Sequence, residues 1–203
     1  MKVRFSILIP AIFERLDRLG KLVAELERQI SAEQWSGVEI VSVVDNRIVT
    51  VGEKRQMTLD VSHGDYVAFV DDDDWVAPNY VSEIMKAIGQ ADPVDVITFN
   101  NKSWIEEHDP IIIRMNLRAP NEQVQFPGGA QRAAWHTCAW NARIAKAAKF
   151  PKINYGEDWG WAEQLNAMSV TEHHIPLPLH HYIYNQKSSR ATSDADIARA
   201  TQA

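Results

Sequence analysis

Four consecutive aspartates at residues 71–74 follow an apolar segment at residues 66–70, and they form the most chemically suggestive stretch of the chain. An unbroken apolar run of this length, between Gly64 and Pro78, is typical of a strand buried on both faces. In an open α/β sheet, ligands bind just beyond the carboxyl ends of the strands. Adjacent carboxylates repel one another, and Mg²⁺ or Mn²⁺ would supply the missing positive charge. An acidic surface turn is the alternative interpretation.

Two further candidates come from another predicted strand end and a helix start. Asp45 follows the apolar segment 38–44, so it is expected on the same rim of the sheet, where it would accept hydrogen bonds from a base or a ribose. Arg55 lies near the start of a predicted helix, within reach of a base, a phosphate or the acidic run. A simple turn for Asp45 and a solvated helix charge for Arg55 remain the alternatives.

Glu157 and Asp158 open another predicted helix, directly after Gly156. Carboxylates at a helix N-terminus are stabilised by about 0.3–1 kcal/mol, so capping alone would explain them. The functional interpretation is a general base, which typically contributes roughly 10²–10⁴-fold to a rate. The neighbouring Trp159 and Trp161 would then stack on the apolar face of a sugar.

Four histidines crowd the last predicted strands, at positions 173, 174, 180 and 181. A neutral imidazole can complete a metal shell that is poor in carboxylates. Because successive strand residues point to opposite faces, at most one of His180 and His181 would serve. Their spacing is not a zinc signature and Cys138 is the single cysteine, so structural roles remain an alternative.

The composition is that of an ordinary globular protein, with 203 residues, 45% hydrophobic and 24% charged. This length suits one α/β domain with a proper core. A single cysteine excludes an internal disulfide and fits a reducing compartment. No apolar run approaches the roughly 20 residues of a membrane span, and no signal peptide is recognised at the start. A cytoplasmic location is therefore expected.

Predicted strands and helices alternate through about residue 99, which is the pattern of a parallel α/β sheet. The strands are expected at residues 4–9, 38–44, 66–70 and 94–99, and the helices at residues 14–30, 52–62 and 78–88. The second half is less regular. It is expected to contain a hairpin at 104–117, a loop at 126–129, a strand at 135–140, helices at 142–149 and 156–168, and strands at 170–175 and 179–184.

These motifs together resemble the GT-A-fold glycosyltransferases, and family 2 within them. The matching segments keep the family's order over about residues 6–184: SILIP at 6–10, VSVVD at 41–45, GEKR at 52–55, GDYVAFVDDDD at 64–74 and GEDW at 156–159. The resemblance implies a Rossmann-like three-layer α/β sandwich with a mostly parallel central sheet. A single domain is expected over residues 1–185, with a nucleotide-sugar half at 1–100 and an acceptor half at 101–185, followed by a polar tail at 186–203.

By this resemblance, the donor is a nucleotide-diphosphate sugar, most simply a UDP-sugar, and the metal is Mn²⁺ or Mg²⁺. The residues expected to contact the donor are Pro10, Asp45, Arg55, Asp71 and Asp72. Asp73 would hold the metal, with His180 or His181 as a third contact. Asp158 would be the base of an inverting, single-displacement transfer. Asp72 and Asp74 form a second Asp-x-Asp pair, so the sequence leaves two registers open.

The acceptor side is expected to use Trp135, Arg143, Glu157, Trp159 and Trp161. The net charge of the chain is −6, but residues 111–153 hold seven basic residues and one acid, which is +6. Arg143, Lys146 and Lys149 would form one stripe on the predicted helix 142–149. This favours an anionic acceptor, such as a hydroxymethylated DNA base, a phosphorylated glycan or an anionic lipid-linked sugar. A solvated basic helix without a partner is the alternative.

Two other classes of function remain open at this point. A metal-dependent nucleotidyl or phosphoryl transferase also places aspartates at strand ends, but it usually needs a glycine-rich phosphate loop that the chain lacks. A non-catalytic module that binds sugars or nucleotides would need no base at Asp158.

Overall fold

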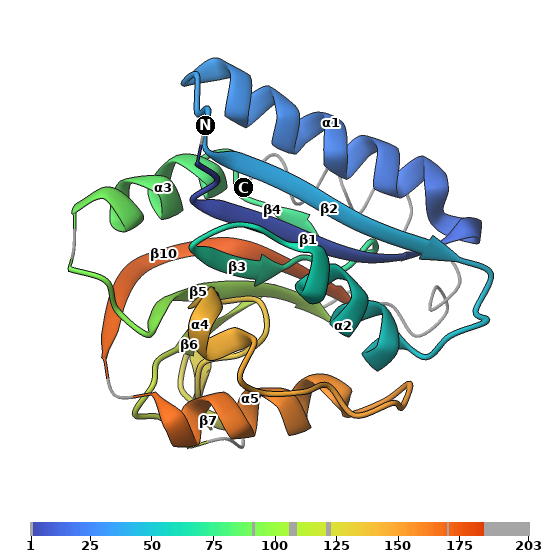
Figure 1. Ribbon diagram of the computed structural model, residues 1–203. Helices are drawn as coiled ribbons and strands as arrows, with labels where there is room; N and C mark the ends of the chain where they lie inside the picture. Colours follow the sequence, from blue (N-terminus) through green and yellow to red (C-terminus); the bar gives the residue numbers. More distant parts are fainter. Residues whose placement is uncertain (1, 91, 106–108, 121–122, 170, 185–203) are drawn as a thin grey trace.

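The computed structural model describes residues 2–90, 92–105, 109–120, 123–169 and 171–184 (Figure 1). The predicted polar tail at residues 186–203 lies outside these ranges. Within them, no helix is long and apolar enough to cross a membrane.

The first half of the chain builds parallel strands joined by helices, as its alternating pattern predicts. Strand β1 (Phe5–Ile12) lies between β2 (Val38–Asp45) and β3 (Tyr66–Phe69), and it is parallel to both. Every residue of β1 and β3 is buried, which explains their unbroken apolar sequences. The connections contain a 3-10 turn, η1 (Phe13–Arg15), and the helices α1 (Leu16–Ala32), α2 (Val51–Val61) and α3 (Tyr80–Gln90).

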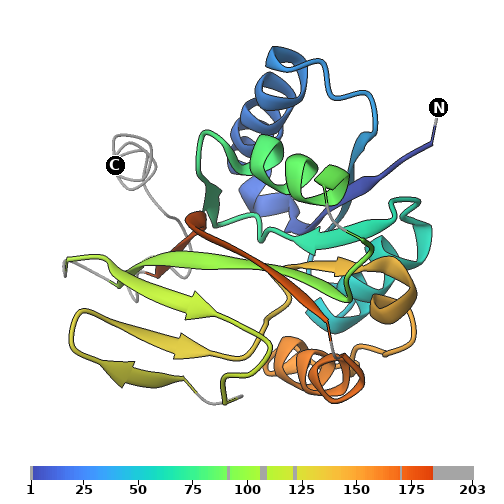
Figure 2. The same ribbon diagram turned by 90° about the vertical axis from the view of Figure 1, so that its left-hand side faces the viewer.

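The second half continues the same sheet and adds strands that run in the opposite direction. Strand β9 (Ala139–Asn141) is inserted antiparallel between β3 and β5 (Val96–Ile105), so β5 keeps the direction of β3. The long β10 (Glu172–Tyr184) runs parallel to β5, and the short β4 (Trp75–Val76) pairs with it in antiparallel fashion. Strands β6 (Ile111–Met115), β8 (Gly129–Arg132) and β7 (Val124–Phe126) extend the sheet beyond β5 (Figure 2).

Helices cover both faces of the sheet, which gives three layers (Figures 1 and 2). Helices α1 and α3 pack with Phe5, Ile7 and Ile9 in one core cluster. On the other face, α2, α4 (Ala142–Ala145) and α5 (Glu157–Met168) pack with Leu8, Phe69 and other residues in a second cluster. The predicted α/β sandwich with a mostly parallel central sheet is confirmed.

Several predictions for the second half need correction. Residues 135–138 precede β9 as a loop, so the predicted strand at 135–140 is mostly wrong. The predicted helix at 142–149 ends at Ala145 in α4. The two late strands are one strand, β10, whose pairing register with β5 shifts between Ile175 and His180. The predicted loop at 126–129 is the turn between β7 and β8. The hairpin predicted at 104–117 is confirmed as β5 and β6.

Gly52 brings α2 close to the segment that leads into α5, and this contact explains why a glycine stands there. A Cβ at this position would lie 1.9 Å from the carbonyl oxygen of Pro151. We expect Gly52→Ala to lower the free energy of unfolding by about 1–3 kcal/mol, because the backbone must shift to accept the methyl group. Urea unfolding followed by fluorescence measures this change.

Gly20 is the matched control, since it lies within α1 and a Cβ there would meet no atom within 4 Å. Gly20→Ala is expected to raise the unfolding free energy by about 0.4–1 kcal/mol, because the unfolded chain loses conformational freedom. Unfolding of Gly52→Ala at the wild-type urea midpoint would show that the two segments do not pack as described.

Candidate active site

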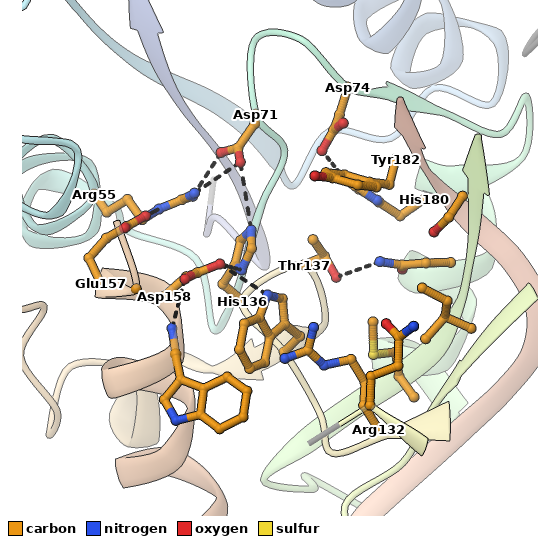
Figure 3. A pocket seen from close by; sticks show the side chains of 18 of the residues that line it. Arg55, Asp71, Asp74, Arg132, His136, Thr137, Glu157, Asp158, His180 and Tyr182 are labelled. Atoms are coloured by element: carbon orange, nitrogen blue, oxygen red, sulfur yellow. Dashed lines mark hydrogen bonds and ion pairs between the residues drawn. The ribbon is translucent and has the colours of Figure 1, made fainter. Parts of the chain in front are cut away.

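A cavity of about 690 Å³ opens where β3, β5 and β10 meet the N-terminus of α5 (Figure 3). Its volume is within the range of about 300–1,000 Å³ that is typical of small-molecule sites. Charged and polar side chains from distant parts of the sequence meet there, among them Arg55, Asp71, Arg132, His136, Asp158 and His180.

Burial alternates along the four aspartates. The side chains of Asp72 and Asp74 are each 4% exposed, whereas those of Asp71 and Asp73 are 28% and 32% exposed. Asp72 accepts a hydrogen bond from the Ile12 N–H at 2.9 Å. Asp74 accepts one from the Ile183 N–H at 3.1 Å. The buried pair therefore ties the loop to the fold. Asp71 and the buried Asp74 line the cavity, whereas Asp73 is exposed but is not among the residues that line it.

Arg55 joins the aspartate loop to the start of α5. Its Nη2 donates to Asp71 Oδ2 at 2.9 Å and its Nε donates to Glu157 Oε1 at 3.0 Å. Burial alone would raise the pKa of Asp71, but the Arg55 guanidinium and His136 hold that pKa well below its usual range. Asp71 is therefore ionised, and Glu157 serves as the second partner of Arg55.

Local sequence explains how these groups are positioned. Helix α2 begins with a capping box, in which the Thr50 hydroxyl accepts from the Glu53 N–H at 3.2 Å and the Glu53 carboxylate accepts from the Thr50 N–H at 3.1 Å. Helix α5 begins after Gly156, whose φ of 80° favours glycine. The first turn of α5 then carries Glu157 and Asp158 into the cavity.

Asp158 accepts two hydrogen bonds and lies beside His136, and none of these three contacts was predicted from sequence. The Trp135 Nε1 donates to Asp158 Oδ2 at 3.1 Å, and the Trp159 N–H donates to Oδ1 at 2.8 Å. His136 Nδ1 lies 3.3 Å from Asp158 Oδ2, and its Nε2 lies 3.8 Å from Asp71 Oδ2. Figure 3 shows this imidazole between the two carboxylates. His136 therefore links the predicted base to the aspartate loop.

The aspartate loop carries more negative charge than its neighbours neutralise. Burial raises the pKa of Asp73 to about 6, with Arg15 opposing the rise and the neighbouring Asp71 and Asp72 adding to it. Burial and the negative charges of Asp73 and Asp71 raise the pKa of Asp74 well above its usual range. Arg15 Nη1 supplies one counter-charge, at 2.7 Å from Asp72 and 2.9 Å from Asp73. An added cation would stabilise the ionised loop further.

His180 has the properties of a metal ligand. Burial lowers its pKa to about 3, so the imidazole is neutral. Its Nε2 lies 3.3 Å from Asp74 Oδ2, and neither ring nitrogen makes a hydrogen bond. Within the described ranges, no three His, Cys, Asp or Glu residues form a complete ion site by themselves. The donor set of carboxylates and one imidazole suits a metal that is shared with substrate phosphates.

Comparison with known proteins points to one family. Residues 49–145, just under half of the chain, match the sequence model of glycosyl transferase family 2. EpsH of Bacillus subtilis (strain 168), which is named as a glycosyltransferase, is 23% identical over 157 residues that cover 68% of this chain and 45% of EpsH. The sequence of this chain thus resembles glycosyl transferase family 2.

Solved structures agree with the fold of this family 2-like chain. S. aureus TarS 1-349 in complex with UDP-GlcNAc superposes with a TM-score of 0.63 and 14% identity, over 94% of this chain and 62% of TarS. The mannosyltransferase PcManGT from Pyrobaculum calidifontis, in complex with GDP-Man and Mn²⁺, gives a TM-score of 0.53 and 12% identity, over 93% of this chain and 59% of PcManGT. The family 2-like chain thus spans less than two thirds of these relatives.

On the donor side, the structure brings together only some of the residues predicted from sequence. Arg55 and Asp71 line the cavity, whereas Pro10 and Asp45 do not. The Asp45 carboxylate is 2.6 Å from Lys54 Nζ and accepts hydrogen bonds from the N–H groups of Ile48 and Val49. Burial alone would raise the pKa of Asp45, but the interactions with Lys54 and with the two backbone N–H groups lower it to about 2.

Four predicted contacts are corrected. The Asp72 carboxylate faces Ile12 and Arg15 instead of the cavity. His181 packs against Trp104, with ring centres 5.0 Å apart, and does not line the cavity, which leaves His180 as the metal candidate. Trp161 is fully buried and stacks on Phe150, so it cannot contact an acceptor. Arg143 lies outside the cavity, 3.8 Å from Asp95.

The basic stretch at residues 111–153 does not form the predicted stripe, because α4 is only one turn long. Lys146 Nζ donates to the Ser62 carbonyl at 2.7 Å, and Lys149 and Lys152 lie 3.7 Å from Asp60 and 3.5 Å from Glu53. These positive charges therefore meet polar or acidic groups from the first half of the chain. All seven basic residues of this stretch lie within the described ranges, and of these seven only Arg132 lines the cavity.

Proposed function

We propose that this chain transfers a sugar from a nucleotide-diphosphate sugar, with a UDP-sugar as the first candidate, to an acceptor hydroxyl by a single displacement with inversion. The observation that carries the proposal is the placement of Asp158 in one cavity with Asp71 and Arg55. The family 2 match and the fold shared with TarS in complex with UDP-GlcNAc support the same class of reaction.

The roles of the side chains follow from their contacts. Asp158 accepts the proton of the acceptor hydroxyl, and its Oδ2 is oriented for this by the Trp135 indole N–H. Asp71 faces the donor and is kept ionised by Arg55, so it accepts hydrogen bonds from sugar or ribose hydroxyls. Glu157 holds Arg55 in place from the side of α5. Proton acceptance and donor positioning are thus assigned to different carboxylates.

The donor set fits a divalent metal, and we propose Mn²⁺ or Mg²⁺. Asp73 and His180 are the residues that would hold it, because Asp73 is the most exposed carboxylate of the loop and His180 is a neutral imidazole. When bound, such a metal stabilises the negative charge that develops on the leaving diphosphate. The presence of Mn²⁺ in the complex of PcManGT supports this choice.

A donor screen tests the proposal. The purified chain is incubated with Mn²⁺ and a set of UDP- and GDP-sugars, and the release of nucleoside diphosphate is measured. We expect at least one donor to be hydrolysed slowly and saturably, since water can replace the acceptor at Asp158. Release of pyrophosphate or orthophosphate would indicate a nucleotidyl or phosphoryl transferase instead. Stability of every donor would contradict the proposal.

A further inference from the structure

We propose that Arg132 and the polar wall of β5 form an acceptor subsite for a sugar that carries a phosphate or a carboxylate group. This inference rests on the proposed function, because it names the acceptor class of the same cavity. The residues of this subsite differ from those assigned to donor binding and to proton acceptance.

Arg132 presents a charge to the cavity that the protein does not neutralise. Its Cζ lies 3.3 Å from the centre of the Trp135 ring and 5.9 Å from that of Trp159, so the guanidinium is stacked on indole. Its Nε is buried without a hydrogen-bond partner, and no ion pair joins it to a carboxylate among the described residues. By contrast, Arg55 contacts both Asp71 and Glu157. The edge of the Arg132 guanidinium is thus available to a ligand.

The environment of Arg132 makes an anionic ligand favourable. Burial lowers the pKa of Arg132 to about 10, and the negative charge of Asp158 offsets only part of that effect. A partly desolvated guanidinium gains strongly from a carboxylate or phosphate that accepts two parallel hydrogen bonds. Stacking on Trp135 holds the guanidinium plane in a fixed orientation, which favours this geometry.

The wall beside Arg132 offers unsatisfied polar groups to a hydroxylated ligand. Asn101 and Ser103 on β5 are 5% and 1% exposed and line the cavity, yet Asn101 Oδ1 and Ser103 Oγ have no hydrogen-bond partner within the described part of the chain. Buried polar atoms are nearly always paired, so these two indicate a ligand with hydroxyl groups. Ile113 and Met115 on β6 add an apolar surface nearby, which suits the carbon face of a sugar.

The same observations disfavour a nucleic acid as the acceptor. Four of the six basic residues of the stretch 111–153 that lie outside the cavity contact Asp60, Glu53, Asp95 or the Ser62 carbonyl, so the stretch does not form a continuous track for a phosphate backbone. A protein with a net charge of −6 also lacks the basic domain that nucleic-acid binding usually requires. Binding of a sugar with one anionic group requires only one cation in the cavity, which Arg132 supplies.

A first experiment tests the anion site without sugar transfer. Inorganic phosphate is titrated into the protein at constant ionic strength with excess UDP, and the fluorescence of the tryptophans beside Arg132 is recorded. We expect Arg132→Gln to raise the phosphate Kd by at least about tenfold, through loss of charge-assisted hydrogen bonds. Arg118→Gln is the matched control, because Arg118 is exposed and lies outside the cavity. Equal phosphate affinity in the wild type and Arg132→Gln would overturn the proposal.

A second experiment identifies the anion. Methyl glycosides of glucose, galactose and mannose are each compared with the 6-phosphate and the uronate of the same sugar, as acceptors for a donor that the wild type hydrolyses. We expect an anionic member to have a KM at least about tenfold below that of its neutral partner. Arg132→Gln should remove this difference chiefly through KM, and Arg132→Lys should restore part of it.

The outcomes separate the two proposals. Two results would overturn the anionic subsite: equal KM values for neutral and anionic sugars, or no transfer to any anionic sugar by a protein that hydrolyses the donor. Either result would leave the proposed function standing. Absence of donor hydrolysis together with phosphate binding that depends on Arg132 would overturn the proposed function alone. The 6-phosphate and the uronate distinguish a phosphorylated acceptor from a carboxylated one.

Discussion

Replacement of Asp158 with Asn is expected to slow sugar transfer by roughly 10²–10⁴-fold, because the amide cannot accept the proton of the acceptor hydroxyl. The shape of the side chain is unchanged, and its oxygen can still accept the hydrogen bond that the Trp135 indole donates at 3.1 Å. Donor binding should therefore persist, since the donor contacts assigned to Asp71 and Arg55 are not altered. Single-turnover transfer rates and UDP-sugar titration by calorimetry measure the two effects separately.

Asp60→Asn is the matched control for this experiment. Asp60 lies near the end of α2, its side chain is 54% exposed, and it contacts Gln56 and Lys149 outside the cavity. The control should transfer sugar at the wild-type rate. Wild-type transfer by Asp158→Asn would show that another group takes the proton, and a product with retained anomeric configuration would exclude a single displacement. Loss of donor binding would instead assign Asp158 to the donor side.

The parts of the fold that sequence alone could predict are those with a strong periodic pattern. Strands β1 and β3 are buried on both faces, and α1 places Leu19, Leu22 and Leu26 on one side, so each has a clear signal. The start of α5 could also be predicted, because Gly156 and two acidic residues mark it. Asp71 follows β3, and its position at the rim follows from the general rule for strand ends, whereas Asp158 lies in the first turn of α5.

The second half was harder to predict because its secondary structure depends on tertiary contacts. Residues 135–138 have the composition of a strand, but their side chains are buried by packing around Trp140 and the Asp158 site instead of by strand pairing. Charge spacing predicted a basic stripe on a short helix at 142–149, whereas Lys149 and Lys152 lie beside Asp60 and Glu53 of α2, far away in sequence. A local sequence pattern does not indicate partners that are so distant in sequence.

The site residues that the sequence analysis missed are those whose role depends on neighbours that only folding brings close. His136 was not predicted to link the two carboxylates, and its position between Asp71 and Asp158 depends on how β9 enters the sheet. Arg132 was one of seven basic residues in the stretch 111–153, and only the cavity distinguishes it from the others. An available signal was the close spacing of Arg132, Trp135 and His136, three residue types that often bind ligands.

Asp73→Asn is expected to lower Mn²⁺-dependent turnover by at least about 100-fold, because a metal supplies several kcal/mol of charge stabilisation and each 1.36 kcal/mol is a factor of ten. The fold should be retained, since the Asp73 side chain is 32% exposed and Arg15, its ion-pair partner, also contacts Asp72. Calorimetric titration of Mn²⁺ in the presence of UDP provides a measurement that does not depend on activity. The wild type in EDTA gives the reference for metal removal.

Asp72→Asn tests the register of the acidic run, because it makes the same chemical change at the next residue. Asp72 is buried and accepts hydrogen bonds from the Ile12 N–H and from Arg15. Its replacement should lower the free energy of unfolding by about 1–3 kcal/mol, as expected when a buried charged pair loses its anion, and should leave Mn²⁺ affinity close to that of the wild type. The opposite result, with Mn²⁺ binding lost in Asp72→Asn and kept in Asp73→Asn, would assign the metal to the Asp72 and Asp74 pair. That assignment would require Asp72 to leave both Ile12 and Arg15, so these contacts favour Asp73 over Asp72 as the metal ligand.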